Sequence, residues 1–129
     1  MNDTDFARAV RHITPEAVRD TLMEMVDIAS PTGREGAMAQ YVVAQLKQAG
    51  CAARLQDVSE NRPNAVGVRA GTGEGVNLLF TGHMDTSYDG DEDYLQGEGF
   101  KAKGVYRDGW IWGLGANNMK SGLASALIA

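Results

Sequence analysis

Residues 76–86 read VNLLFTGHMDT, an apolar run that ends in a histidine and an aspartate two positions apart. Residues 76–80 are apolar on both faces except at Asn77, which is the pattern of a central strand covered on both sides. Open α/β sheets place their ligand sites in the loops that follow such strands. The stretch therefore predicts an interior strand that leads directly into a functional loop.

His83 and Asp85 lie on the same side of an extended backbone, because side chains two residues apart share a face. Two interpretations are open. His83 is either a polar residue at the end of the strand, satisfied by local hydrogen bonds, or a metal ligand. In the second case Asp85 accepts a hydrogen bond from one ring nitrogen and leaves the other nitrogen free for the metal. The spacing alone is compatible with both.

The surrounding sequence predicts a mixture of helices and strands. Thr14 is a suitable N-cap and Pro15 a suitable first helical residue, and Gly50 is a suitable helix stop. The expected elements are helices over residues 15–28, 35–48 and from about 118, strands over 53–56, 65–70 and 76–80, a long loop over 86–104 and a hairpin over 105–112 around Asp108-Gly109. The predicted fold is α/β: a mostly parallel mixed sheet covered by helices.

Charge and composition exclude several classes of partner. The 129 residues contain 12 Lys and Arg against 17 Asp and Glu, a net charge of −5, so nothing favours binding to nucleic acid. Cys51 is the single cysteine, which excludes an intrachain disulfide and favours a reducing compartment. No apolar run is long enough to span a membrane, and no signal peptide precedes the first helix. We therefore expect a cytoplasmic protein without a membrane partner.

A second motif makes the metal interpretation of His83 more specific. Residues 113–122 read GLGANNMKSG and join a predicted strand to a predicted helix. Together with LLFTGHMDT, with SPTGREG at residues 30–36 and with Asn64, this resembles the zinc metallopeptidase and amidohydrolase family. That family includes aminoacylase, acetylornithine deacetylase, succinyl-diaminopimelate desuccinylase and carboxypeptidase G. The resemblance runs from about residue 15 to residue 129.

The resemblance implies a site and an activity. His83 would be a metal ligand, and Asp85 would be the catalytic-site carboxylate that orients its ring. The family holds two zinc ions, for which cobalt or manganese can substitute, and position 118 would supply the ligand that bridges them. The implied reaction is hydrolysis of an amide or peptide bond in a small N-acyl amino acid or peptide substrate.

Asn118 departs from the family pattern, which has an aspartate before Met-Lys. Two metal ions about 3.5–4 Å apart require a bridge with two anionic oxygens. An amide offers one acceptor oxygen and an NH2 group that repels a cation. Asn118 is therefore expected to bind one metal ion and to bridge two poorly.

The family's general-base glutamate and its remaining metal ligands have no counterpart in residues 1–129. We expect the chain to be the N-terminal part of a metallohydrolase catalytic domain, without the lid and dimerisation domain through which the full-length form could form a homodimer. By itself it should be inactive. The alternative is a non-catalytic homologue, or a fragment, that acts as a binding or structural module. An EF-hand is not expected, because Gln96 occupies the position of the bidentate glutamate.

Overall fold

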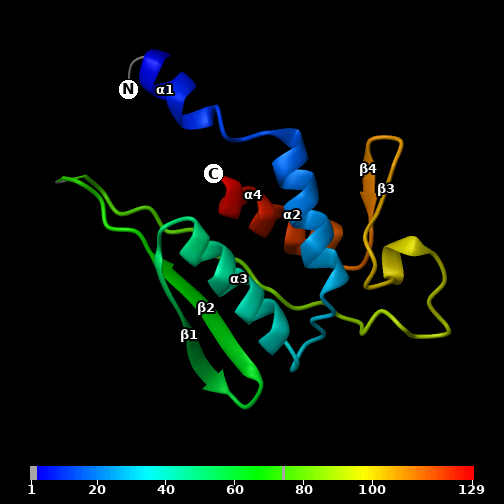
Figure 1. Cartoon of the computed structure of the whole chain (residues 1–129). Coiled ribbons are helices and arrows are strands. Elements are labelled where there is room, and N and C mark those ends of the chain that lie inside the picture. The colour runs from blue at the N-terminus through cyan, green and yellow to red at the C-terminus, as the bar shows by residue number, and fades with distance from the viewer. Residues whose placement is uncertain (1–2, 74) are drawn as a thin grey trace.

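The computed structural model describes residues 3–73 and 75–129. Its helices and strands, in chain order, are α1 (Asp3–Val10), α2 (Pro15–Asp27), α3 (Gly36–Gln48), β1 (Ala52–Ser59), β2 (Arg62–Val68), η1 (Glu98–Phe100), β3 (Val105–Arg107), β4 (Trp110–Trp112), η2 (Ala116–Lys120) and α4 (Ser121–Ile128). Helix α3 packs along the β1–β2 hairpin, α2 lies beside α4, and α1 extends away from the other elements (Figure 1).

Local sequence signals place the helix ends where they are predicted. The Thr14 hydroxyl accepts a hydrogen bond from the Ala17 amide at 3.1 Å, so Thr14 caps the start of α2. Helix α3 stops before Gly50, which has a φ of +80° and so takes the left-handed conformation that ends many helices. Both expectations are confirmed to within two residues.

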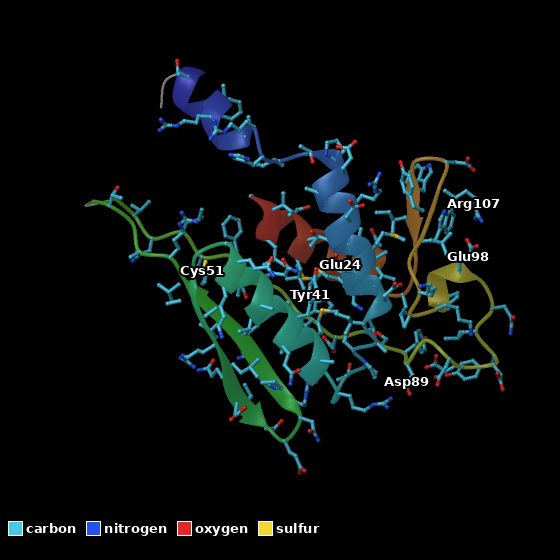
Figure 2. All side chains as sticks on the ribbon, in the orientation of Figure 1. Glu24, Tyr41, Cys51, Asp89, Glu98 and Arg107 are labelled. Carbon is cyan, nitrogen blue, oxygen red and sulfur yellow. The ribbon has the colours of Figure 1, made fainter. Side chains whose placement is uncertain are left out.

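The core is formed where α2, α3 and α4 meet. Its fully or nearly buried residues are Leu22, Met25 and Val26 of α2, Met38 and Val42 of α3, and Ala124 of α4. The Tyr41 hydroxyl also donates to Glu24 Oε2 at 2.8 Å and so links α3 to α2 (Figure 2). This core fixes the C-terminal end of α2, against which the candidate site is assembled.

The predicted β-hairpin around Asp108-Gly109 is confirmed. Asp108 and Gly109 have φ values of 54° and 83°, as a tight two-residue hairpin turn requires. Arg107 donates to both carboxylate oxygens of Glu98, at 3.1 and 2.9 Å, and so ties β3 to η1 (Figure 2). Apart from η1, the predicted loop over residues 86–104 contains no helix or strand.

The sheet differs from the prediction. Helices and strands are mixed, as in the α/β class, but both two-stranded sheets, β1–β2 and β3–β4, are antiparallel. A parallel sheet is not found in residues 3–73 and 75–129, where the parallel pairing that occurs is an isolated bridge between Pro31 and Thr86.

The prediction of an interior strand over residues 76–80 is wrong. The segment pairs with no strand of the described chain, and its apolar side chains are 64–98% exposed at Val76, Leu78, Leu79 and Phe80. The apolar run favours an extended backbone, but a strand also requires a neighbouring strand whose amides and carbonyls form hydrogen bonds with it. That neighbour is a long-range property that the run itself does not encode.

Candidate functional site

The backbone around His83 is held by the loop that follows α2. The Thr86 amide donates to the Ser30 carbonyl at 2.8 Å, and the Thr32 amide donates to the Thr86 carbonyl at 3.1 Å. The buried Ser30 hydroxyl adds a bond of 2.8 Å to the Met84 carbonyl. Residues 84–86 are therefore fixed against residues 30–32, although residues 76–80 before them are unpaired.

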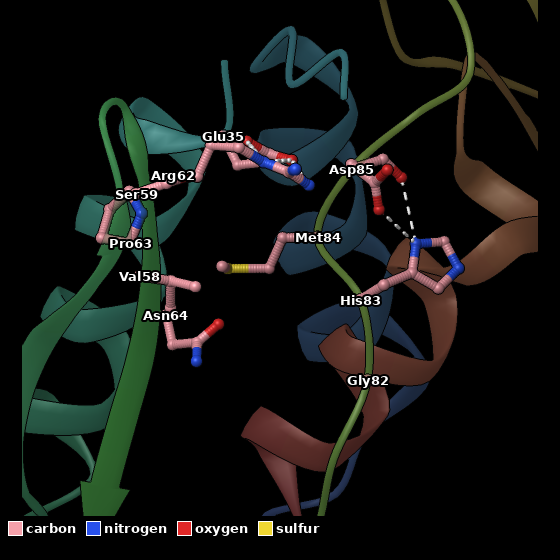
Figure 3. Close-up of a pocket in the computed structure, with 10 residues that line it drawn as sticks. All are labelled: Glu35, Val58, Ser59, Arg62, Pro63, Asn64, Gly82, His83, Met84 and Asp85. Atoms are coloured by element: carbon pink, nitrogen blue, oxygen red, sulfur yellow. Dashed lines mark hydrogen bonds and ion pairs between the residues drawn. The ribbon is translucent and has the colours of Figure 1, made fainter. Parts of the chain in front are cut away.

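His83 is in contact with a polar partner on each ring nitrogen. Its Nδ1 lies 3.0 Å from Asp85 Oδ1 and 3.1 Å from the Asp85 carbonyl (Figure 3). Its Nε2 lies 3.0 Å from Asn118 Oδ1. Two residues 35 positions apart thus meet at the end of the 76–86 stretch. Their roles as metal ligands, and that of Asp85 in catalysis, remain predictions.

These contacts favour the charged form of both ionisable groups. Both ring nitrogens of His83 face oxygen atoms, which only an imidazolium can satisfy as a double donor. The Asn118 contact, followed by those with Asp85, raises the pKa of His83 above its ordinary value. The pKa of Asp85 is lowered, first by the hydrogen bond from the Thr32 hydroxyl and then by its own amide and by His83. In the neutral ring, Nε2 becomes an acceptor, available to an amide NH2 group or to a metal ion.

The donor pair lies close to the spacing of one edge of a zinc site. Zinc takes imidazole nitrogen and oxygen ligands at about 2.0–2.2 Å in tetrahedral geometry, so two neighbouring ligands lie roughly 3.3–3.6 Å apart. The 3.0 Å separation of His83 Nε2 and Asn118 Oδ1 is a hydrogen-bond distance, and the two atoms would move apart by a few tenths of an ångström to hold the ion. Both donors are neutral, however, and a zinc site normally has three or four protein ligands.

A buried lysine anchors η2, the segment that carries Asn118, to the end of α2. Lys120, at the end of η2, is 2% exposed and donates from Nζ to the carbonyls of Met25 and Ile28, at 3.0 and 2.9 Å. Burial lowers its pKa to about 8. In the sequence Lys120 is recognised only as a member of the second motif, and neither contact is predicted. The signal that could have indicated one is a lysine at the start of an otherwise apolar helix.

One glycine in each motif allows the two segments to approach. A Cβ on Gly82 would lie 2.6 Å from Met119 Cε and 2.9 Å from Leu123 Cδ2. Gly115 has a φ of +80°, and a Cβ there would lie 2.7 Å from Thr86 Cγ2. The close approach of His83 to the turn that carries Asn118 therefore depends on the absence of side chains at these two positions.

A polar pocket of about 250 Å³ opens beside His83, between the end of the β1–β2 hairpin and residues 82–85 (Figure 3). On its rim the buried Glu35 accepts hydrogen bonds from the Gly33 amide at 3.0 Å and from Arg62 at 3.0–3.3 Å. Burial by itself raises the pKa of Glu35, but these bonds outweigh it and the pKa is lowered. Glu35 of the SPTGREG motif thus fastens the loop to the hairpin. Asn64 also lines the pocket and lies within β2.

A separate acidic group lies in the loop after Thr86. Asp89, Asp91 and Glu92 have carboxylate oxygens within 4.8 Å of one another. Glu92 already accepts from the amides of Asp89 and Gly90, at 2.8 and 2.9 Å, and Asp89 is paired with Arg34. Hydrogen bonds within the loop and the ion pair with Arg34 therefore already occupy the carboxylates of Glu92 and Asp89. The group lies outside the His83 site.

Comparison with known proteins agrees with the motifs. A protein of Pyrococcus furiosus named as a LysW-lysine/LysW-ornithine hydrolase is 31% identical over 117 residues, which is 91% of this chain and 31% of the relative. The succinyl-diaminopimelate desuccinylase of Wolbachia sp. subsp. Brugia malayi is 29% identical over 108 residues, which is 82% of this chain and 26% of the relative. The chain is a relative of these hydrolases. The similarity supports the resemblance to the metallopeptidase and amidohydrolase family.

The similarity covers only part of each relative. The chain spans 26–31% of the length of the curated relatives that it matches. No family model matches the chain, and no solved structure does. Among the described residues, no helix is long and apolar enough to cross a membrane.

Proposed function

We propose that this chain forms one side of the metal centre of a metal-dependent hydrolase of amide or peptide bonds. The reaction would be that of an N-acyl amino acid deacylase or of a carboxypeptidase or dipeptidase, acting on small substrates. One observation carries the proposal: the His83 ring lies between the Asp85 carboxylate on one nitrogen and the Asn118 side chain on the other. The hydrolase names of the relatives support it.

Each of the three residues has a distinct task in this proposal. Nε2 of His83 and Oδ1 of Asn118 would hold the metal ion, with zinc expected and cobalt or manganese as substitutes. When bound, such an ion polarises an amide carbonyl and lowers the pKa of water. Asp85 keeps the proton on Nδ1 of His83, so that the lone pair on Nε2 is directed toward Asn118.

The carboxylates beside the pair are not available as a general base. Oδ1 of Asp85 is bonded to His83, and Oδ2 accepts a hydrogen bond of 2.5 Å from the Thr32 hydroxyl. Glu35, which also lines the pocket, is bonded by Gly33 and Arg62. General-base catalysis needs a carboxylate that can take a proton from the attacking water. We therefore expect residues 1–129 alone not to hydrolyse N-acyl amino acids or dipeptides.

In a protein of the relatives' length, the chain would be the N-terminal part of the catalytic domain. The general base and the remaining metal ligands would then come from other residues, together with a lid and dimerisation domain through which a homodimer could form.

A second candidate function, a non-catalytic binding or structural module, is favoured by Asn118, because an amide bridges two metal ions poorly.

The proposal is tested first by zinc titration of the chain, observed by NMR. Zinc should shift the ring signals of His83 and the side-chain amide of Asn118 together. His83→Ala should abolish these shifts, whereas His12→Ala, which changes the other histidine, should leave them intact. Zinc-induced shifts confined to residues 89–92 would contradict the proposal.

The second test uses a protein of the relatives' length. There, His83→Ala should abolish hydrolysis of N-acetyl and N-succinyl amino acids. A wild-type protein that binds zinc but hydrolyses none of these substrates would favour the non-catalytic module.

A further inference from the structure

The Thr32 side chain makes a contact that the motifs do not assign. Its hydroxyl donates to Oδ2 of Asp85 at 2.5 Å, across 53 residues of sequence. The other oxygen of the same carboxylate, Oδ1, faces Nδ1 of His83 at 3.0 Å. Thr32, Asp85, His83 and Asn118 therefore form one continuous chain of polar contacts.

A second partner on Asp85 has a geometric consequence. Rotation about the last side-chain bond of an aspartate is only weakly restricted, so one hydrogen bond does not fix the plane of the carboxylate. With one partner on each oxygen, the plane is fixed and Oδ1 is held toward His83. Hydrogen bonds to a charged carboxylate are short and strong, in agreement with the 2.5 Å separation.

The hydroxyl itself is presented from a fixed backbone. The Thr32 amide is bonded to the Thr86 carbonyl at 3.1 Å, and the Thr86 amide to the Ser30 carbonyl at 2.8 Å, on either side of Pro31. The Thr86 carbonyl is also an alternative acceptor for the Thr32 hydroxyl, at 3.4 Å. The shorter distance and the negative charge favour Asp85 as the acceptor.

We propose that Thr32 is a positioning residue of the site, whose hydroxyl orients the Asp85 carboxylate and thereby keeps the His83 proton on Nδ1. The use of this positioning in metal binding rests on the proposed function, but the effect of the Thr32–Asp85 hydrogen bond on His83 can be tested without a metal. The hydrogen bonds of the Thr32 hydroxyl go to Asp85 and to the Thr86 carbonyl, so its proposed effect on His83 passes through Asp85.

Two substitutions at one position separate the hydroxyl from the rest of the side chain. Thr32→Val keeps the shape and removes the donor, whereas Thr32→Ser keeps the donor and removes the methyl group. Thr32 is exposed, so neither change leaves a cavity. Thr86→Val is the matched control, because it removes a hydroxyl in the paired segment that bonds to the Tyr88 carbonyl at 2.8 Å and not to Asp85.

The first measurement uses the metal-free chain. Long-range proton–nitrogen NMR spectra, recorded where the His83 ring is neutral, report which ring nitrogen carries the proton. The wild type, Thr32→Ser and Thr86→Val should show the proton on Nδ1, and Thr32→Val should shift toward the Nε2-protonated form. Thr32→Val with the wild-type tautomer, or Thr32→Ser with the tautomer of Thr32→Val, would overturn the inference.

The second measurement is the zinc affinity of the same four proteins. Loss of the hydrogen-bonded partner of a metal ligand typically weakens metal binding by about 10–100-fold. Thr32 is one contact further from the metal, so we expect a loss of up to about tenfold, in Thr32→Val alone. Equal zinc affinity in wild type and Thr32→Val would contradict the inference. If no protein of the set binds zinc at His83, the proposed metal site fails, and the tautomer measurement still decides the role of Thr32.

Discussion

Replacing Lys120 with methionine should remove a pH-dependent part of the free energy of unfolding. Lys120 is 2% exposed, and burial lowers its pKa from 10.5 to about 8. Between these values the unfolded chain still carries the proton that the folded chain has lost, so stability rises with pH. Integrated from about pH 8 to about pH 9.5, the gain is about 1.5 kcal/mol, at about 1.4 kcal/mol per pKa unit.

The variant should still fold near neutral pH, because two effects oppose each other. Methionine removes the cost of burying an ammonium group, about 3 kcal/mol for a pKa lowered from 10.5 to about 8. It also removes the lysine partner of two carbonyls: that of Ile28 loses its hydrogen bond, at about 1–3 kcal/mol, whereas that of Met25 keeps a bond from the Ile28 amide at 3.3 Å. Exchanging a buried charge for an apolar side chain of similar volume is often tolerated for this reason.

Urea unfolding monitored by circular dichroism at several pH values measures the effect. The wild-type midpoint should rise across the window by on the order of 1 M urea, and that of Lys120→Met should not. Lys103→Met is the control: Lys103 is exposed and pairs with Asp27 at 3.2 Å, so the rise should remain. The scan stops near pH 9.5, because burial and Glu24 raise the pKa of Tyr41, which reduces stability at higher pH. Parallel pH profiles for wild type and Lys120→Met would refute the reasoning.

Three further predictions concern the site itself. Calorimetry should show only weak zinc binding to residues 1–129, and tight stoichiometric binding would contradict a site with two neutral donors. Asn118→Asp should tighten zinc binding by about tenfold or more and, in a protein of the relatives' length, raise the hydrolysis rate; a lower rate would identify the amide as an adapted ligand. Gly115→Ala should destabilise the chain by about 1–3 kcal/mol in urea unfolding, because its φ is +80° and its Cβ would lie 2.7 Å from Cγ2 of the buried Thr86, whereas Gly71→Ala, with open space around it, should cost little.

The sequence alone was sufficient where the physical cause is local. The Thr14 hydroxyl caps α2 by accepting from an amide three residues along the chain, Gly50 ends a helix through its own backbone conformation, and Asp108-Gly109 forms its turn with immediate neighbours. The pairing of His83 with Asn118 was expected only from the family resemblance, which assigns both positions to one metal site. Their metal-binding roles remain predictions.

The tertiary structure decided everything that depends on a partner far along the chain. Residues 76–80 have the composition of a central strand but pair with no strand in the described residues, because a strand needs a neighbour that its own sequence does not supply. In the same way, the sequence did not indicate that Lys120 would reach the end of α2 or that Thr32 would hold Asp85. Both are hydrogen bonds between segments more than fifty residues apart, and only the packing of α2, α4 and the paired loops brings their atoms together.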